Sequence, residues 1–209
     1  MKQTTKKIFQ SILYIVYNVF SPKLFNWLNS RYNQLYSMWK TNEFKQASSI
    51  YIQYPIYLRG GKYITIGDNF GCDQRLVLDA WANFLGDRFN PEITIGNNVS
   101  IQKDCHIGAI NKIVIGNNVL LASRVYISDH SHGEVNLEAI KLPPSQRKLF
   151  SKGPVIIEDN VWLGEGVVVL PNVTIGKNSI VGANAVVTKS FPKNSVIAGN
   201  PAKLIRILD

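Results

Sequence analysis

The chain has 209 residues, of which 45% are hydrophobic and 18% charged, so it can bury a substantial core and is not disordered by composition. This length suits one large domain, or one domain with an appendage. The net charge of +9 favours anionic partners, namely phosphorylated metabolites, an anionic membrane surface or nucleic acid. Two cysteines, Cys72 and Cys105, are too few for a disulfide framework, so a reducing cytosol is the expected compartment.

Residues 1–50 have the spacing of helices. Apolar residues recur at three- and four-residue steps on both sides of Ser21-Pro22, which predicts two helices that meet there. The apolar stretch from Ile8 to Phe20 is shorter than the ~20 residues of a membrane span, and no cleavage site follows it, so we expect a soluble or at most peripheral protein. Basic residues predominate in this segment, where Glu43 is the one acidic residue. The basic residues are Lys2, Lys6, Lys7, Lys23, Arg31, Lys40 and Lys45.

Two interpretations of this N-terminal segment stay open. Its apolar side either packs against the main domain or a neighbouring subunit, or it lies on a membrane surface, to which its basic and aromatic residues are suited.

From about residue 62, aliphatic residues recur at every sixth position. They are Ile95, Ile101 and Ile107; Ile115, Leu121 and Ile127; and Ile157, Leu163, Val169, Ile175, Val181 and Val187. A second apolar set stands four places further on: Val99, Cys105, Val119, Val125, Val161, Val167, Val173 and Ala185. Pairs such as Asn97-Asn98 and Asn117-Asn118 place turn formers between the short segments. The stretch ITIGDNFGCDQR, residues 64–75, indicates an earlier coil.

A period of six fits neither an amphipathic helix nor a simple strand. It is typical of a hexapeptide β-helix, in which each face of a triangular coil is one short strand and the recurring aliphatic residue points inward. Between Ile127 and Ile157 the period stops, and it then resumes in the same phase. We therefore expect residues 129–154 to form a loop outside the coil stack, and long excursions of this kind are usually functional.

The repeat, the segment VWLG at residues 161–164 and the ending VIAGNPAKLIR at residues 196–206 resemble the left-handed β-helix hexapeptide acyltransferases. Within that family, the chain is most similar to the sugar O-acetyltransferases of galactoside, maltose and bacterial surface-polysaccharide type. The resemblance covers roughly residues 60–206. It implies an all-β fold, with a helical segment over residues 1–58, then a left-handed parallel β-helix acyltransferase domain over residues 59–209 that ends in a short tail.

The resemblance also implies the reaction, which is acetyl transfer from acetyl-CoA to a sugar hydroxyl without a metal ion. The hydroxyl must lose its proton as it attacks the thioester carbonyl, and an imidazole is a suitable general base, contributing typically 10²–10⁴-fold. Coenzyme A carries the activated acyl group, so the protein supplies orientation and charge stabilisation. Relatives use a loop histidine as the base, and the loop here contains His130 and His132.

The choice between the two histidines depends on register. Counted without gaps from Ile127, the relatives' base falls on His132, which is therefore favoured, whereas His130 would need a shift of two residues. Gly133 stands where many relatives have proline, so the assignment of His130 as the base stays open. Asp129 is a candidate to contact the acceptor, to hold the other imidazole nitrogen or to cap the loop. The remaining interpretation is that both histidines are exposed loop residues without a role.

The resemblance assigns further binding residues. Trp162 would line the acceptor pocket, because an indole can stack on the apolar face of a sugar, and the alternative is a subunit contact. The coenzyme-contacting positions of the family fall on Ala183, Thr188, Lys189, Lys203 and Arg206. Lysine and arginine there would bind phosphate, and the alternative is that these positions serve coil packing and a solvated face.

Related enzymes are trimers, which implies a homotrimer with the active site between neighbouring coils. Rival functions are an N-acetyltransferase acting on an amino sugar or nucleotide-sugar, a non-catalytic scaffold, and a γ-carbonic-anhydrase-like zinc enzyme using His106, His130 and His132. The zinc family spaces its histidine pair H-x₄-H, whereas here it is H-x-H. No nucleic-acid motif is recognised. The basic aromatic N-terminus favours a lipopolysaccharide or capsule precursor as acceptor, at the cytoplasmic face of the membrane.

Overall fold

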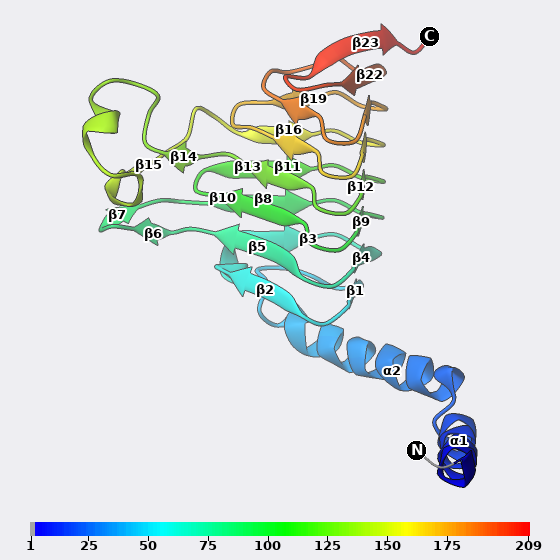
Figure 1. Ribbon diagram of the computed structural model, residues 1–209. Helices are drawn as coiled ribbons and strands as arrows, with labels where there is room; N and C mark the ends of the chain where they lie inside the picture. Colours follow the sequence, from blue (N-terminus) through cyan, green and yellow to red (C-terminus); the bar gives the residue numbers. More distant parts are fainter. Residues whose placement is uncertain (1–2) are drawn as a thin grey trace.

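The structure, a computed structural model, describes residues 3–209 and places two helices ahead of a stack of short strands (Figure 1). Helix α1 (Gln3–Val19) and helix α2 (Pro22–Thr41) are joined at Ser21, whose hydroxyl accepts a hydrogen bond from the Leu24 N–H at 3.3 Å and caps α2. The two predicted helices and their junction are confirmed. Lys2, counted above with the basic residues, lies outside the described residues. Within residues 3–209, neither helix is long and apolar enough to cross a membrane.

The C-terminal half of α2 closes one end of the strand stack. Ser37 is buried, and its hydroxyl accepts a hydrogen bond from the Ile52 N–H at 2.8 Å. Asn33 Oδ1 accepts another from the Tyr54 N–H at 3.1 Å. These bonds satisfy backbone groups at the open end of the stack, as the terminal cap of a repeat protein must. In contrast, the side chains of residues 5–20 are exposed and α1 extends away from the stack (Figure 1).

The rest of the chain is wound into three parallel sheets of five, six and eight strands. The five-stranded sheet contains β3 (Ile64–Ile66), β8 (Glu92–Ile95), β11 (Lys112–Ile115), β16 (Val155–Ile157) and β19 (Thr174–Ile175). The six-stranded sheet contains β2 (Ile56–Arg59), β5 (Leu76–Ala80), β10 (His106–Ala109), β13 (Tyr126–Ser128), β18 (Val168–Val169) and β21 (Val186–Val187). The eight-stranded sheet contains β1 (Ile50–Ile52), β4 (Phe70–Cys72), β9 (Ser100–Ile101), β12 (Leu120–Leu121), β17 (Trp162–Leu163), β20 (Ile180–Val181), β22 (Ser195–Ala198) and the antiparallel β23 (Lys203–Ile207).

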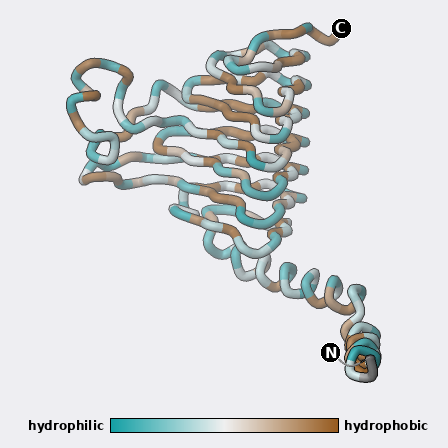
Figure 2. The backbone as a smooth tube through the Cα atoms, in the orientation of Figure 1, coloured by the Kyte–Doolittle hydropathy of each residue, from teal (hydrophilic) through white to brown (hydrophobic). Residues whose placement is uncertain are grey.

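Consecutive strands go to the five-, eight- and six-stranded sheets in turn, so the chain forms a parallel β-helix with three faces. The predicted six-residue period is confirmed, because each repeat aliphatic from Ile95 to Val187 is at most 1% exposed. The second apolar set is buried to the same extent. Apolar segments accordingly recur on successive coils along the stack (Figure 2). Stacking is what buries them, since a single coil could not cover its own apolar face.

One corner of the β-helix is built from a ladder of asparagines. Each of six asparagines has a positive φ between 56° and 62°, and each side-chain amide except the last donates to the side-chain oxygen of the asparagine on the next coil at 2.9–3.1 Å. The rungs are Asn69, Asn98, Asn118, Asn160, Asn178 and Asn194. Asparagine tolerates the left-handed conformation better than other residues with a Cβ. Gly96, which precedes one rung pair, is required for close approach, because a Cβ there would lie 2.8 Å from Asn117 Oδ1.

Two antiparallel hairpins interrupt the winding on the same side of the stack (Figure 1). The first is β6 (Asn83–Phe84) with β7 (Asp87–Arg88), and the second is β14 (Ser131–His132) with β15 (Leu149–Phe150). The second hairpin is the base of the extruded loop (residues 129–154), which lies between β13 and β16 and carries the 3₁₀ turns Ala139–Lys141 and Pro144–Gln146. A third 3₁₀ turn, Gly61–Tyr63, precedes β3.

The coil begins before the boundary expected at residue 59. Strands β1 and β2 already pair with β4 and β5, and the helical part ends at Thr41. The early coil is stabilised in the same way as the later ones, with Ile52 fully buried, although its corners lack the Gly-Asn signals of the later turns.

Candidate active site

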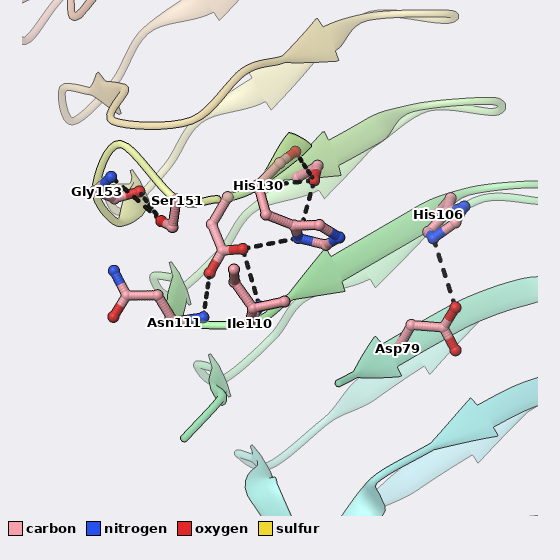
Figure 3. Close-up of polar contacts among 9 residues, drawn as sticks. Asp79, His106, Ile110, Asn111, His130, Ser151 and Gly153 are labelled. Atoms are coloured by element: carbon pink, nitrogen blue, oxygen red, sulfur yellow. Dashed lines mark hydrogen bonds and ion pairs between the residues drawn. The ribbon is translucent and has the colours of Figure 1, made fainter. Parts of the chain in front are cut away.

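The extruded loop begins at a buried carboxylate. Asp129 is 0% exposed, and its carboxylate accepts hydrogen bonds from the Ile110 N–H at 2.9 Å and the Asn111 N–H at 2.8 Å. The same carboxylate lies 2.9 Å from Nδ1 of His130 (Figure 3). These three partners satisfy a charge that would otherwise be costly to bury, and they hold the start of the loop against the neighbouring coil.

This contact orients the His130 imidazole. An ionised carboxylate only accepts hydrogen bonds, so Nδ1 carries the proton that it shares with Asp129, and Nε2 keeps its lone pair. The hydroxyl of Ser128 lies 3.3 Å from the same Nδ1. The side chain of His130 is 13% exposed, so the ring is held in place and can still be reached. An imidazole with a free acceptor nitrogen and an anion behind it is the arrangement of a general base.

His132 has a different environment. It is exposed on β14, opposite Leu149, and its ring packs edge-on against Phe84 at a centroid distance of 5.5 Å. Within residues 3–209, no hydrogen bond or ion pair involves its ring nitrogens. The register argument favoured His132, but the structure gives the orienting carboxylate to His130. Asp129 holds an imidazole nitrogen, whereas a direct contact with an acceptor is contradicted by its complete burial.

Two cavities border His130, one on each side of the loop along the stack. The N-side cavity, of about 380 Å³, is lined by both loop histidines and by Asp79, Trp81, Phe84 and His106. The C-side cavity, of about 580 Å³, is lined by Lys152 from the end of the loop and by Thr188 and Lys189 from a later coil. His130, Ser131 and Tyr126 contribute to both. His130 therefore lies where molecules bound in the two cavities would meet.

Asp79 and His106 form the polar part of the N-side cavity. Asp79 Oδ2 lies 3.8 Å from Nε2 of His106 (Figure 3). The Tyr126 ring packs edge-on against that imidazole at a centroid distance of 5.3 Å. Burial lowers the pKa of His106 below its ordinary value of 6.5, with the nearby Asp79 charge opposing this effect. His106 is therefore neutral near pH 7 and can act as a hydrogen-bonding group.

Sequence reasoning missed most of the residues that line the two cavities, among them Asp79, Trp81, Phe84, Tyr126 and Lys152. A signal was present for Asp79, an acid within the apolar run LVLDAW.

The family model described as bacterial transferase hexapeptide (six repeats) matches residues 154–189. The "Putative lipopolysaccharide biosynthesis O-acetyl transferase WbbJ" of Escherichia coli K12 is 40% identical over 159 residues, which cover 74% of this chain and 77% of that protein. This chain belongs to the hexapeptide-repeat acetyltransferases. The galactoside O-acetyltransferase of Escherichia coli K12 is 34% identical, and the match covers 77% of this chain but 62% of that protein. The solved structure of the Vibrio cholerae hexapeptide-repeat acetyltransferase VCA0836 complexed with acetyl coenzyme A is 26% identical, with a TM-score of 0.51 and coverage of 81% and 74%.

Of the residues assigned to the coenzyme by the family resemblance, the structure brings Thr188 and Lys189 to the C-side cavity beside His130. Lys203 and Arg206 are exposed on β23, at the last strand of the eight-stranded sheet, and Ala183 is exposed on the turn after β20. These three line neither cavity.

Trp162 also lies apart from the histidines within one chain. It is 48% exposed on β17 of the eight-stranded sheet, whereas His130 follows β13 of the six-stranded sheet. Its strand neighbours are Leu120, which is 38% exposed, and Ile180, so the outer face of this sheet carries a partly exposed apolar strip.

The zinc alternative finds no ligand set in the described part of the chain. His106, His130 and His132 line one cavity, but within residues 3–209 no three His, Cys, Asp or Glu side chains are grouped so that they could hold a metal ion. A structural zinc site needs four ligands, and a catalytic one at least three.

Proposed function

We propose that this acetyltransferase transfers the acetyl group of acetyl-CoA to a sugar hydroxyl in surface-polysaccharide biosynthesis, that is, of lipopolysaccharide or capsule, with His130 as the general base. The observation that carries the proposal is the position of His130 between the two cavities, with the buried Asp129 carboxylate on its Nδ1. The names of the similar proteins, which include lipopolysaccharide and galactoside O-acetyltransferases, support the acceptor class.

In this mechanism, Nε2 of His130 takes the proton of the acceptor hydroxyl as its oxygen attacks the thioester carbonyl. The carbon–sulfur bond breaks, the new ester forms, and the imidazolium returns its proton to the coenzyme thiolate. Asp129 remains ionised and stabilises the imidazolium while it exists. The three hydrogen-bonding partners of Asp129 keep this carboxylate in place, so the base requires little reorganisation during the reaction.

The C-side cavity is the proposed donor site. Lys152 and Lys189 supply positive charge there, and Thr188 supplies a hydroxyl, which suits the phosphates and amides of coenzyme A. Ala183, Lys203 and Arg206 are assigned to the same coenzyme, further along the stack, where its adenosine phosphates would lie. The pantetheine arm would then run along the coils and end at His130.

A homotrimer with left-handed coils completes this arrangement. The apolar strip of Leu120, Trp162 and Ile180 is the proposed contact with a neighbouring copy, because a parallel β-helix can bury such a strip only against another surface. Trp162 would then face the acceptor site of the neighbour. Sedimentation equilibrium of wild type and of Trp162→Glu tests this: wild type should be trimeric, and an unchanged assembly of the variant contradicts the proposed contact.

Helix α1 is the proposed peripheral contact with the cytoplasmic face of an anionic membrane. Its exposed apolar side includes Ile8, Ile12 and Ile15, each at least 52% exposed, while Lys6 and Lys7 are its only charged residues within 3–19. Apolar burial and attraction to anionic headgroups both favour this orientation.

Vesicle flotation tests the membrane contact. Wild type should float with vesicles that contain phosphatidylglycerol and remain behind with purely zwitterionic ones. Ile12→Glu should abolish flotation, and Gln10→Glu, which adds the same charge on the polar side, should weaken it far less. Equal loss in the two variants would mean that charge alone, and not apolar insertion, is responsible.

The acetyl-transfer proposal is tested by turnover across a panel of sugars and amino sugars with wild type, His130→Ala and His132→Ala. We expect His130→Ala to lose about 10²–10⁴-fold in kcat while acetyl-CoA binding by calorimetry is retained. A loss confined to His132→Ala would move the base to His132. Transfer only to amino sugars would replace the hydroxyl acceptor by an amine.

A further inference from the structure

The β6–β7 hairpin lies beside the extruded loop and is tied to it. Lys148 Nζ in the loop lies 3.1 Å from Asp87 Oδ1 in the hairpin, and Phe84 packs against His132. The hairpin turn consists of Leu85 and Gly86, with φ of 48° and 87°, the two-residue turn with positive φ that suits paired strands. A leucine adopts this conformation only at a cost in free energy. The other contacts of the hairpin must offset that cost.

Two aromatic side chains, Trp81 just before the hairpin and Phe84 on β6, form an apolar wall. Trp81 and Phe84 meet edge to face, with ring centroids 5.9 Å apart, and both line the N-side cavity. The guanidinium of Arg59 lies 3.5 Å from the centroid of the Trp81 ring and covers one face of the indole. This cation–π contact holds the indole in position before any ligand binds.

The floor of the same cavity carries a carboxylate with free acceptor capacity. The side chain of Asp79 is 17% exposed, and its nearest cationic or imidazole partners, Arg59 Nε and His106 Nε2, lie at 4.0 and 3.8 Å, beyond hydrogen-bond distance. Within residues 3–209, no side-chain hydrogen bond ends on this carboxylate. A largely buried carboxylate needs partners, and a ligand in the cavity can supply them.

We propose that the β6–β7 hairpin and the residues just before it are the acceptor-recognition element, in which Trp81 and Phe84 pack against the apolar face of the sugar ring and Asp79 accepts hydrogen bonds from its hydroxyls. The inference rests on the proposed function and assigns the ligand of the N-side cavity. An aromatic wall opposite a carboxylate matches a pyranose, which has an apolar C–H face and a rim of O–H donors. The cavity volume of about 380 Å³ is within the range of small-molecule sites, and its border at His130 places the ring beside the base.

The kinetic test compares Asp79→Asn and Phe84→Leu with Asp104→Asn, a matched change at an exposed carboxylate outside both cavities. For the sugar that gives the fastest transfer, Asp79→Asn should raise the KM for that sugar at least about tenfold. The reason is that the sugar hydroxyls lose their hydrogen bonds to the negatively charged Asp79 carboxylate. The KM for acetyl-CoA should stay within about twofold, and Asp104→Asn should behave as wild type. An unchanged sugar KM in both cavity variants overturns the proposal.

A binding test separates this proposal from the proposed function. Methyl glycosides of galactose, glucose, rhamnose and N-acetylglucosamine are titrated into the full chain without coenzyme, with ligand-detected NMR as the readout. We expect binding of at least one glycoside by wild type and its loss in Asp79→Asn and Phe84→Leu. Such binding without acetyl transfer would refute the proposed function and leave the sugar site standing. Failure of wild type to bind any of the four, or equal binding by the variants, overturns the sugar site.

Discussion

Replacement of one rung of the asparagine ladder tests the physical basis of the β-helix corners. Asn160 has a φ of 58°, accepts a hydrogen bond from the Asn118 amide at 3.0 Å and donates one to Asn178 Oδ1 at 2.9 Å. Asn160→Ala removes both bonds and places a residue with a Cβ in the left-handed region. Asn160→Gly removes the same bonds but adopts that conformation freely.

The two substitutions should therefore differ in free energy of unfolding. Two exposed hydrogen bonds contribute about 0.5–1 kcal/mol each, and the left-handed conformation costs alanine about 1–2 kcal/mol. Glycine avoids that cost but loses about 0.5–1 kcal/mol through the greater freedom of the unfolded chain. We expect destabilisation of about 2 kcal/mol for Asn160→Gly and about 3 kcal/mol for Asn160→Ala.

Urea unfolding followed by circular dichroism at a fixed protein concentration measures both values. Asn111→Ala is the control, because the side chain of Asn111 is exposed and makes no hydrogen bond among residues 3–209, so its change should stay below about 0.5 kcal/mol. If alanine is tolerated as well as glycine, backbone conformation does not select asparagine at this corner and the reasoning fails.

Three further predictions follow from buried groups. Burial raises the pKa of Cys105 to about 11 and raises that of Cys72 as well, so neither thiol should react with a disulfide reagent at pH 8 until the protein is unfolded, when both should react; rapid labelling of the native state would contradict this. Burial lowers the pKa of His106, so the folded state binds fewer protons than the unfolded state between the folded pKa and 6.5. Stability from this group is thus complete above pH 6.5 and is lost as pH falls through the folded pKa. His106→Gln should flatten the dependence of Tm on pH between 7.5 and 5, and an unchanged slope refutes the assignment. Ser37→Ala leaves the buried Ile52 N–H without its hydroxyl partner and should destabilise by about 1–3 kcal/mol in urea, whereas a change near zero would deny α2 its capping role.

The coil core could be predicted from the sequence because its stabilising pattern is local and repeated. Each repeat aliphatic from Ile95 to Val187 marks an inward position without knowledge of its neighbours. The first coil was missed, although Ile52, Leu58 and Ile64 are themselves spaced six residues apart. Its corners are closed by α2 and by other turn residues, so the Asn and Gly signals that accompany the period elsewhere are absent there.

The site was predictable only to the level of the loop. The break after Ile127 locates the excursion, and composition identifies two histidines within it. Which of them has an orienting partner depends on Ile110 and Asn111. Their N–H groups donate hydrogen bonds to the buried Asp129 carboxylate and hold it beside His130. A residue count from Ile127 contains no information on that contact, which joins neighbouring coils.

The wall formed by the β6–β7 hairpin was missed for a similar reason. The stretch WANFLGDR breaks the period only briefly, and its importance comes from contacts with residues distant in the chain. Phe84 contacts His132, and Asp87 contacts Lys148. The partners in each pair are far apart in the chain, so a single sequence does not reveal that they meet.

The in-phase return of the coil at Val155 has an evolutionary consequence. The extruded loop departs after Ser128 and re-enters on the strand register that β11 and β19 already define, so its length is independent of the winding. Closing a longer loop costs little, since each doubling of length adds only about 0.6 kcal/mol. Insertions, deletions or wholesale exchange of the loop together with its companion hairpin can therefore accumulate without unfolding the scaffold. A lineage of such enzymes can change the glycans that it modifies while the stack beneath stays the same.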